Sequence, residues 1–363
     1  MTALPPSPTV VPDVEGRPPF GIYQGEVGTV QLDRLARPWA FPAWARRLRR
    51  KRWHYALYAT HEVIAVMAVA ELGYVANAFF AALDLRDKQP LIDVTLLGAP
   101  DPFTTVSEQM TRGLTARFRV PGARLRFHRG PEEDRYHHAV DLSALRFPRT
   151  GGVHLRGEAL TVGAPPPLLM VTPVPEGGAS AGLLGRWLPR DGVNVTLKST
   201  GLLAAGHLEV GRRRYALEGG VVGLDSTDGF LARHTTWRWA MAAGRLDDGT
   251  PVGFNLVDGF NEGPDGKSEN MLSLGDRLFP LGPATFRFNA ADPLDPWQLE
   301  TADGSVRLAF RPLHAHRDAR DLLLVRSRFV QPLGFFSGTL RFGTRTVEVS
   351  ELPGVTEDQD LLW

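Results

Sequence analysis

Residues 225–270 carry the pattern that constrains the fold most. Two segments there place alternate side chains on opposite faces, as strands do, and a tight turn joins them. Within 231–243, the side chains of Trp237 and Trp239 fall on one face, since successive residues of a strand point to opposite sides. The turn at 247–249, Asp-Asp-Gly, combines a glycine that takes positive φ cheaply with aspartates that cap their own backbone. The segment therefore predicts a β-hairpin.

The return strand of this hairpin carries a carboxylate. Asp258 shares its predicted face with four large apolar side chains: Val252, Phe254, Leu256 and Phe260. A carboxylate on such a face must be paired, hydrogen-bonded or protonated, because removing the charge from water is costly. Asp258 either caps the turn at 259–263 or acts as a proton donor or polar anchor in an apolar cavity. A register slip that leaves Asp258 exposed is the third interpretation.

Short candidate strands recur along the rest of the chain between glycine and proline turns, and convincing long amphipathic helices are missing. Residues 53–59 are rich in aromatic side chains, and residues 62–70 are β-branched on both faces, as in a buried strand. This spacing is typical of antiparallel sandwiches and barrels. We predict an all-β fold with few short helices, divided into a flexible proline-rich arm at 1–20 and two β-domains at 21–215 and 216–363.

Composition narrows the function classes. The chain has 363 residues, a formal net charge of +1 and no cysteine. Disulfides, thiolate metal sites and cysteine nucleophiles are therefore excluded, and the charge gives no general attraction to nucleic acid. The N-terminus lacks the charged and apolar regions of a signal peptide, and Glu71, Gly73 and Asn77 interrupt the most apolar stretch, 63–83. We expect a soluble, cytoplasmic protein without a metal or cofactor.

The segment Trp39–Trp53 combines aromatic side chains with a basic run at 46–52. Three interpretations stay open: a helix or loop packed on a barrel, a surface that docks on anionic lipid, and a nucleic-acid patch. No recognisable nucleic-acid-binding module accompanies the charges. We expect no nucleic-acid partner and keep peripheral membrane contact through Trp39–Trp53 as an alternative.

Ionisable residues also interrupt apolar strands. His234 is either a satisfied structural histidine or a base. Arg326 either faces solvent or points inward, where it would need an acid such as Asp258, Glu262 or Glu357.

Three further ionisable residues stand in or beside predicted strands. Lys198 follows the apolar run 193–197, and His314 and His316 have the residue type of metal ligands. Neighbouring arginines would repel a cation, and spacing places no third ligand, so a metal site is not predicted. The acidic tail that ends in Trp363 is either solvated or packs that ring against a barrel mouth.

Long strings of the sequence resemble a bacterial family known as domain of unknown function 2804. They include LARHTTWRWAMAAGRLDDGTPVGFNLVDGFNEG, LLLVRSRFVQPLGFFSGTL and LPGVTEDQDLLW, and the upstream KRWHYALYATHEVIAVMAVAELGYVANAFFAALD. The strand-rich layout is similar to proteins with two lipocalin-like barrels, of the carotenoid hydratase and tocopherol cyclase type. That resemblance implies an apolar cavity large enough for an isoprenoid or lipid-like ligand. It also implies acids that protonate alkenes or hold a carbocation without a cofactor.

From these patterns we expect two lipocalin-like β-domains that bind a hydrophobic small molecule in a barrel cavity. The expected chemistry is cofactor-independent hydration, cyclisation or isomerisation, with Asp258 as the acid and Glu262 or His234 as the base. A non-catalytic lipid carrier and a structural protein with filled barrels are the alternatives. The expected ligand-binding residues are Trp53, Tyr55, Trp237, Trp239, Phe254, Phe260, Asn261 and Arg326.

Overall fold

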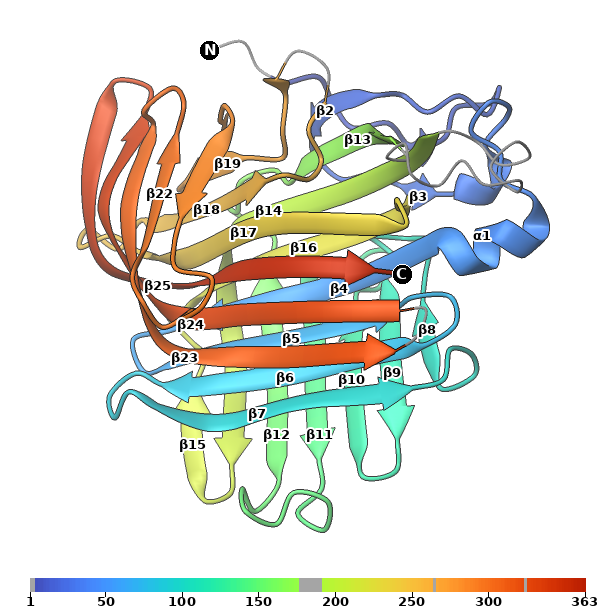
Figure 1. Cartoon of the computed structure of the whole chain (residues 1–363). Coiled ribbons are helices and arrows are strands. Elements are labelled where there is room, and N and C mark those ends of the chain that lie inside the picture. The colour runs from blue at the N-terminus through green and yellow to red at the C-terminus, as the bar shows by residue number, and fades with distance from the viewer. Residues whose placement is uncertain (1–3, 176–190, 264–265, 323–324) are drawn as a thin grey trace.

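The computed structural model describes residues 4–175, 191–263, 266–322 and 325–363. In this part of the chain the strands outnumber the helices, which are one α-helix, α1 (Ala43–Arg49), and one short 3-10 helix, η1 (Leu32–Arg34). Two large antiparallel sheets and one two-stranded pair account for the strands that the structure describes (Figure 1). The predicted all-β fold is confirmed.

The larger sheet has 14 strands within the described ranges. Its main path runs β7 (Gln89–Gly98), β6 (Ala76–Asp84), β5 (Val63–Glu71), β4 (Arg50–Ala59), β16 (Val221–Phe230), β14 (Asp191–Val210), β12 (Val153–Leu160), β11 (Arg135–Leu142), β10 (Ala123–His128), β9 (Thr115–Val120) and β8 (Thr104–Val106). Beside this path, β14 also pairs with β13 (Leu168–Pro175) and β15 (Arg213–Ala216), and β13 pairs with β2 (Gly21–Gln24).

The smaller sheet has nine strands, counted over the same residues. Its order is β20 (Arg277–Pro280), β19 (Met271–Leu274), β18 (Pro251–Asp258), β17 (His234–Arg245), β25 (Arg345–Leu362), β24 (Val325–Phe342), β23 (Val306–Leu322), β22 (Trp297–Thr301) and β21 (Ala284–Arg287). β17 and β18 form the predicted hairpin, with Arg245 opposite Pro251.

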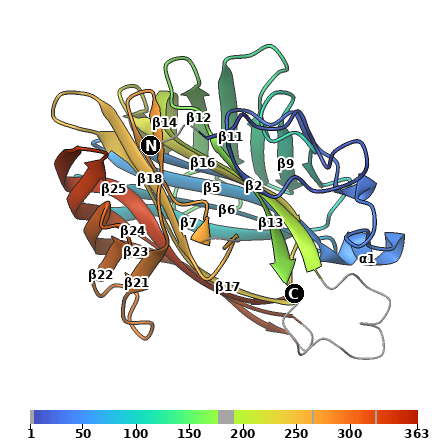
Figure 2. The same ribbon diagram turned by 90° about the horizontal axis from the view of Figure 1, so that it is seen from above.

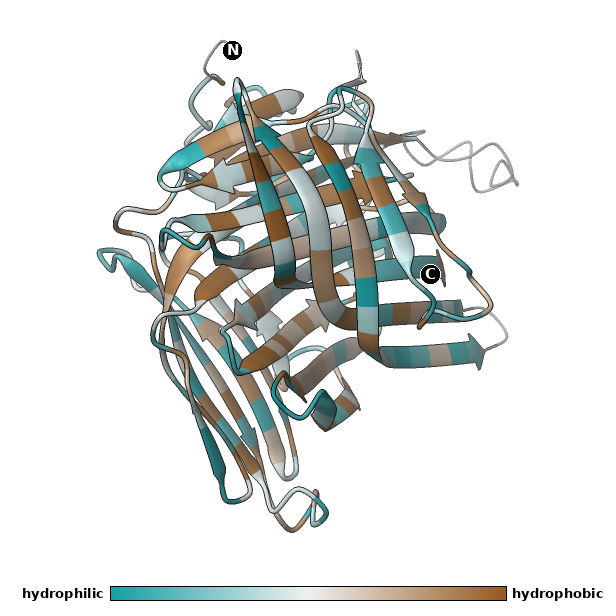
Figure 3. Cartoon of the chain, turned by 90° about the vertical axis from the view of Figure 1, so that its left-hand side faces the viewer, coloured by the Kyte–Doolittle hydropathy of each residue, from teal (hydrophilic) through white to brown (hydrophobic). Residues whose placement is uncertain are grey.

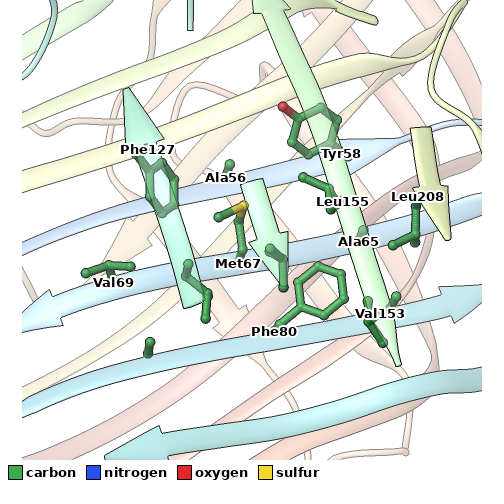
Figure 4. Packing of buried hydrophobic residues seen from close by; sticks show 14 of the residues in the cluster. Ala56, Tyr58, Ala65, Met67, Val69, Phe80, Phe127, Val153, Leu155 and Leu208 are labelled. Carbon is green, nitrogen blue, oxygen red and sulfur yellow. The ribbon is translucent and has the colours of Figure 1, made fainter. Parts of the chain in front are cut away.

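The larger sheet curls until two of its parts face each other. β14 joins these parts, because its first half pairs with β13, its second half pairs with β12, and a register shift separates Ser199 from Leu202. Tyr58, Met67 and Phe80 from β4–β6 then meet side chains of β10, β12 and β14 (Figure 4). The interior of this first barrel is packed with side chains.

The smaller sheet also curls around an apolar interior. Phe336 of β24 contacts Phe254 and Phe310, with ring centroids 4.9 and 4.4 Å away. Fully buried Trp297 lies in the same core. This second barrel is therefore filled as well, whereas a ligand cavity inside a barrel was expected.

A third apolar cluster lies where the two sheets meet. It uses the face of β4–β6 that points away from the first barrel, and it includes Leu57, Val66, Trp239 and Met241. The long strands β23–β25 run alongside β4–β7 (Figures 1 and 2). Alternating polar and apolar bands along many strands, visible in Figure 3, supply the two faces that this arrangement needs.

The chain passes from the larger to the smaller sheet between Phe230 and His234, because β16 still pairs with β4 and β14. The predicted domain division at residue 215 stays a prediction. In the predicted N-terminal arm, β1 (Val10–Val11) pairs in parallel with β3 (Thr29–Val30). No helix of the described residues is long and apolar enough to cross a membrane.

Candidate functional site

A cavity of about 160 Å³ lies between the two sheets rather than inside either barrel. Strands β4–β7, β14 and β16 form one wall, and β17, β18 and β23–β25 form the other. Half-buried lining residues, among them Trp53, Leu72 and Phe79, mark its solvent-facing side. Eight aromatic rings line it: Trp53, Tyr55, Phe79, Trp237, Trp239, Phe260, Phe329 and Trp363.

Strand alternation decides which residues reach this cavity. In β4 the odd-numbered Trp53 and Tyr55 face it, whereas the even-numbered Tyr58 faces the first barrel. In β17 the odd-numbered Trp237 and Trp239 face it from the other side. Aromatic residues spaced two apart on two strands therefore close an aromatic box at the contact between the sheets.

The rings of the two walls touch. Trp53 stacks on Trp237 with centroids 6.2 Å apart and planes 18° apart. Tyr55 meets Trp239 edge to face at 5.3 Å, and Phe260 packs on Trp237 at 5.2 Å. Such ring faces carry partial negative charge and stabilise a nearby cation.

Glu357 of β25 is the acid within this box. Its Oε1 accepts a hydrogen bond from the Trp237 indole at 2.7 Å, and its Oε2 accepts one from the Gln331 amide at 2.8 Å. Burial raises the pKa of Glu357 to about 7, although these two hydrogen bonds oppose the rise. The nearby charge of Asp225 adds to the increase. Glu357 is therefore poised to donate or accept a proton near neutral pH.

A buried ionic cluster lies in the wall of the same cavity. Lys198 Nζ lies 2.6 Å from Asp225 Oδ1 and 3.0 Å from Glu269 Oε1. The register explains this contact, because Tyr55, Asp225 and Lys198 are direct neighbours across β4, β16 and β14. Trp53 reaches the same cluster, with its indole N–H 3.4 Å from Asp225 Oδ2.

The pKa values of Lys198 and Glu269 are both raised in this cluster, for different reasons. Burial alone would lower the pKa of Lys198, but the attraction of Asp225 and Glu269 outweighs it and raises that pKa. Burial raises the pKa of Glu269 against the opposing attraction of Lys198. Lys198 therefore stays a cation and holds at least one carboxylate as its counterion.

Five of the predicted ligand-binding residues line the cavity, namely Trp53, Tyr55, Trp237, Trp239 and Phe260. Phe254 does not, because it lies on the opposite face of β18 in the second barrel.

Asp258 also lies away from the cavity. It is paired with Arg238 across β17 and β18, whereas the next pair along, Trp239 with Val257, faces the cavity. Because alternate residues of a strand point to opposite sides, Asp258 shares a face with Arg238 and not with Trp239. The expectation of an acid in the cavity at this position is corrected: Glu357 occupies that place.

The other predicted polar residues also lie outside the cavity lining. His234 is exposed and binds Asp360 Oδ1 at 2.8 Å, Glu262 is exposed in the turn after β18, and Arg326 faces solvent. Asn261 is buried behind the wall, where its amide donates to Glu269 Oε2 at 2.6 Å. Asn261 therefore supports the ionic cluster.

The prediction missed Glu357, Asp225 and Glu269 as lining residues. The signal for Glu357 was its odd-numbered position, which it shares with Gln359, Leu361 and Trp363 of the cavity wall. No local signal marks Glu269, which reaches Lys198 from the segment that precedes β19. Among the described residues, no group of three or more His, Asp or Glu is arranged to hold a metal ion.

Comparison with known proteins shows similarity to solved structures and to one family, whereas no curated protein matches significantly. Kievitone hydratase from Nectria haematococca is 12% identical, with 88% of this chain and 90% of that chain covered and a TM-score of 0.48. CghA in complex with Sch210972 is 12% identical, with 89% and 91% covered and a TM-score of 0.47. A protein assigned as AttH from Nitrosomonas europaea is 13% identical, with 86% and 92% covered and a TM-score of 0.46. The model of the family described as domain of unknown function DUF2804 matches residues 7–363, and the chain belongs to this family.

Proposed function

We propose that the protein is an enzyme that transfers protons to a small, mostly apolar molecule in the cavity between its sheets, without a cofactor. One observation carries this proposal: Glu357, whose burial raises its pKa to about 7, lies in a cavity walled by aromatic rings. A perturbed acid in a mostly apolar pocket is the usual arrangement of a binding or catalytic site. The reaction classes that fit are hydration, dehydration, isomerisation and cyclisation of an alkene.

In this mechanism protonated Glu357 gives its proton to an alkene carbon, and the positive charge that develops is stabilised by ring faces such as those of Trp237 and Tyr55. The Trp237 and Gln331 hydrogen bonds then stabilise the carboxylate that remains. Lys198 and Asp225 offer a polar anchor for a hydroxyl or carbonyl group at the lining. The remaining rings limit water to the few molecules that the reaction needs.

The cavity size sets the substrate class. A cavity of roughly 150 Å³ holds a benzene ring, so about 160 Å³ suits one ring with a short substituent. An extended isoprenoid, as the resemblance implied, would have to project past half-buried residues such as Phe79. We therefore favour a compact aromatic or cyclic alkene.

The experiment uses 4-vinylphenol, which has one ring and one alkene. In deuterated water, protonation of its terminal carbon by Glu357 puts deuterium in that carbon, and water then adds to the carbon attached to the ring. We expect mass spectrometry to detect labelled 4-(1-hydroxyethyl)phenol or labelled alkene. Glu357→Gln should lower the rate at least about 100-fold, because general acid catalysis contributes about that much.

Binding is measured separately, through quenching of the cavity tryptophans by 4-vinylphenol. Recovery of unlabelled 4-vinylphenol, with no hydration product and with intact binding, would reject the enzyme and favour a carrier. Asp258→Asn is the matched control, since Asp258 lies on the far face of β18 and should leave labelling unchanged.

The carrier is the second candidate, and the surface of α1 favours it. Trp44 and Leu48, one turn apart, are 57% and 49% exposed, and Arg47 is exposed beside them. Such a mixture docks on anionic membranes. Sedimentation with phosphatidylserine vesicles should capture the protein and lose the Trp44→Ala, Leu48→Ala double variant. Capture alone, with no labelling of 4-vinylphenol, would select the carrier.

A further inference from the structure

A buried histidine reaches the cavity from the wall opposite β4–β7. His316 of β23 is 1% exposed and lines the cavity, with its ring stacked on Phe79 at 4.9 Å and 23°. Its Nδ1 bonds to Asp93 Oδ1, which belongs to β7 of the other sheet. Its Nε2 lies 3.3 Å from the Thr95 hydroxyl, and Thr95 also lines the cavity. The imidazole is therefore fixed at both nitrogens.

The bond to Asp93 determines which nitrogen carries the proton. Burial would raise the pKa of Asp93, but hydrogen bonds from His314 and His316 outweigh it and hold that pKa at about 2. Asp93 is therefore a carboxylate and can only accept, so Nδ1 of His316 is the donor. In the neutral ring, Nε2 then carries the lone pair and accepts a hydrogen bond from the Thr95 hydroxyl at the cavity wall. A carboxylate that orients a histidine in this way makes the other nitrogen a base.

The sheet register places this base in one row with Glu357. His316 lies directly opposite Gln331 across β23 and β24, and the Gln331 amide donates to Glu357 Oε2. Strands lie about 4.8 Å apart, so the backbones of His316 and Glu357, two strands apart, are separated by roughly 10 Å. Both side chains line the cavity, so one small molecule bound there can contact both of them.

We infer that His316, positioned by Asp93, is the general base that works opposite Glu357 on the same bound molecule. This inference rests on the proposed function and narrows its reaction class. The site gives a proton at one substrate atom and removes one from another, as in the addition or elimination of water and in double-bond shifts. In a hydration, His316 Nε2 takes the proton of the water that attacks the cation.

The base is tested with 5-nitrobenzisoxazole, a compact bicyclic probe whose ring opening needs only a base. Nε2 of His316 removes the proton at carbon 3, the N–O bond breaks, and its electron pair leaves on oxygen as 2-cyano-4-nitrophenolate. We expect the protein to exceed free imidazole at equal concentration by about 100-fold. His316→Gln should remove that advantage, and imidazole added to His316→Ala should restore part of it.

The matched control is His234→Gln. His234 also pairs with an aspartate, Asp360, but on an exposed face of the sheet, and its loss should leave the rate unchanged. A protein no faster than imidazole, or a rate that survives His316→Gln, overturns the inference.

Asp93 is a positioning residue, and its role has a separate readout. In Asp93→Asn the amide can donate to Nδ1, which moves the ring proton to Nε2 and removes the base. Nitrogen-15 NMR should then show the tautomer of His316 reversed, together with the loss of probe turnover. An unchanged tautomer would contradict the positioning role. Turnover of 5-nitrobenzisoxazole without labelling of 4-vinylphenol would support His316 as a base and reject the acid chemistry of the proposed function. Labelling of 4-vinylphenol without turnover of 5-nitrobenzisoxazole would reject only the role of His316.

Discussion

The two faces of β4–β6 border very different surroundings, although the same strands supply both. Toward the first barrel, Tyr58 and Phe80 enter a core packed with side chains. Toward the smaller sheet, Tyr55 and Phe79 border the cavity. Both sides contain buried ionisable groups with displaced pKa values. The cavity, and not the displaced pKa values, distinguishes the face of the candidate site.

Two consecutive residues of β16 show the same difference between the cavity side and the barrel side. Asp225 points to the cavity and binds Lys198, whereas Ser226 points to the barrel and lies 2.6 Å from His54 Nδ1. Burial lowers the pKa of His54 and of His138 to about 3, so both are neutral. Glu357 on the cavity side titrates near pH 7 instead. Buried polar groups in the barrel are thus held in one protonation state, while the cavity has an acid that changes state at neutral pH.

The largest expected effect comes from a matched pair on β6. Phe80→Ala should lower the free energy of unfolding by about 3–5 kcal/mol, because it opens a void in a packed core. Phe79→Ala should cost only about 1 kcal/mol, since this half-buried ring already borders a cavity and loses mainly its ring contacts. Urea denaturation of both variants measures the difference. Equal losses would break the distinction between the two faces.

The second pair compares ionic and neutral hydrogen bonding. Lys198→Met should destabilise the protein by about 3–5 kcal/mol, because Asp225 and Glu269 lose their cation. Ser226→Ala should cost about 1–3 kcal/mol, since only a neutral imidazole loses its partner. Thermal and chemical unfolding should rank the variants in this order. A Ser226→Ala effect as large as that of Lys198→Met would contradict the assignment of charge to the cavity side.

The third prediction concerns alkaline pH. The folded pKa of Glu357, about 7, lies above its ordinary value of 4.5, so its contribution to stability is complete below about pH 4.5 and disappears as the pH rises through 7. Glu357→Gln should therefore raise the free energy of unfolding by up to about 3 kcal/mol near pH 8 and leave it unchanged near pH 4.

The control for this prediction is Asp358→Asn, on the opposite face of β25, where Arg238 lies 3.5 Å away. It should lose at most about 1 kcal/mol near pH 8 rather than gain stability. A Glu357→Gln variant without the gain at alkaline pH would remove the case for a protonated acid.

The smallest effect is expected in acid, on the barrel side. The folded pKa of His54, about 3, lies below its ordinary value of 6.5, so stability present above about pH 6.5 falls as the pH drops toward 3. Near pH 5, keeping His54 neutral lowers the free energy of unfolding by about 2 kcal/mol, and His54→Gln should remove this loss. Urea denaturation at pH 7 and pH 5 measures how much the free energy of unfolding falls between these two pH values. The control variant is His61→Gln, because His61 is exposed.

Sequence patterns predicted the all-β fold and part of the cavity wall correctly, and the reason is physical. Alternation with period two placed Trp237 and Trp239 on one face correctly, and it is a local property of the strand. Alternation does not say which face of a strand meets the second sheet. The prediction therefore places Asp258 in the cavity, whereas Asp258 pairs with Arg238 on the face of the hairpin that points away from the cavity. Glu269 depends on contact across two sheets, which no local pattern encodes.

The length of β23–β25 has a mechanical consequence. One part of each strand belongs to the second barrel, as Phe310 and Phe336 show, and another forms the cavity wall, as His316 and Glu357 show. The two parts are joined by continuous backbone pairing, with register shifts near Pro312 and Phe336. A movement of the second barrel would therefore carry this wall of the cavity with it, because both belong to the smaller sheet. The half-buried ring of Phe79 stands on the opposite wall, in the larger sheet, so the rate at which guest molecules exchange should respond to the bulk of this side chain.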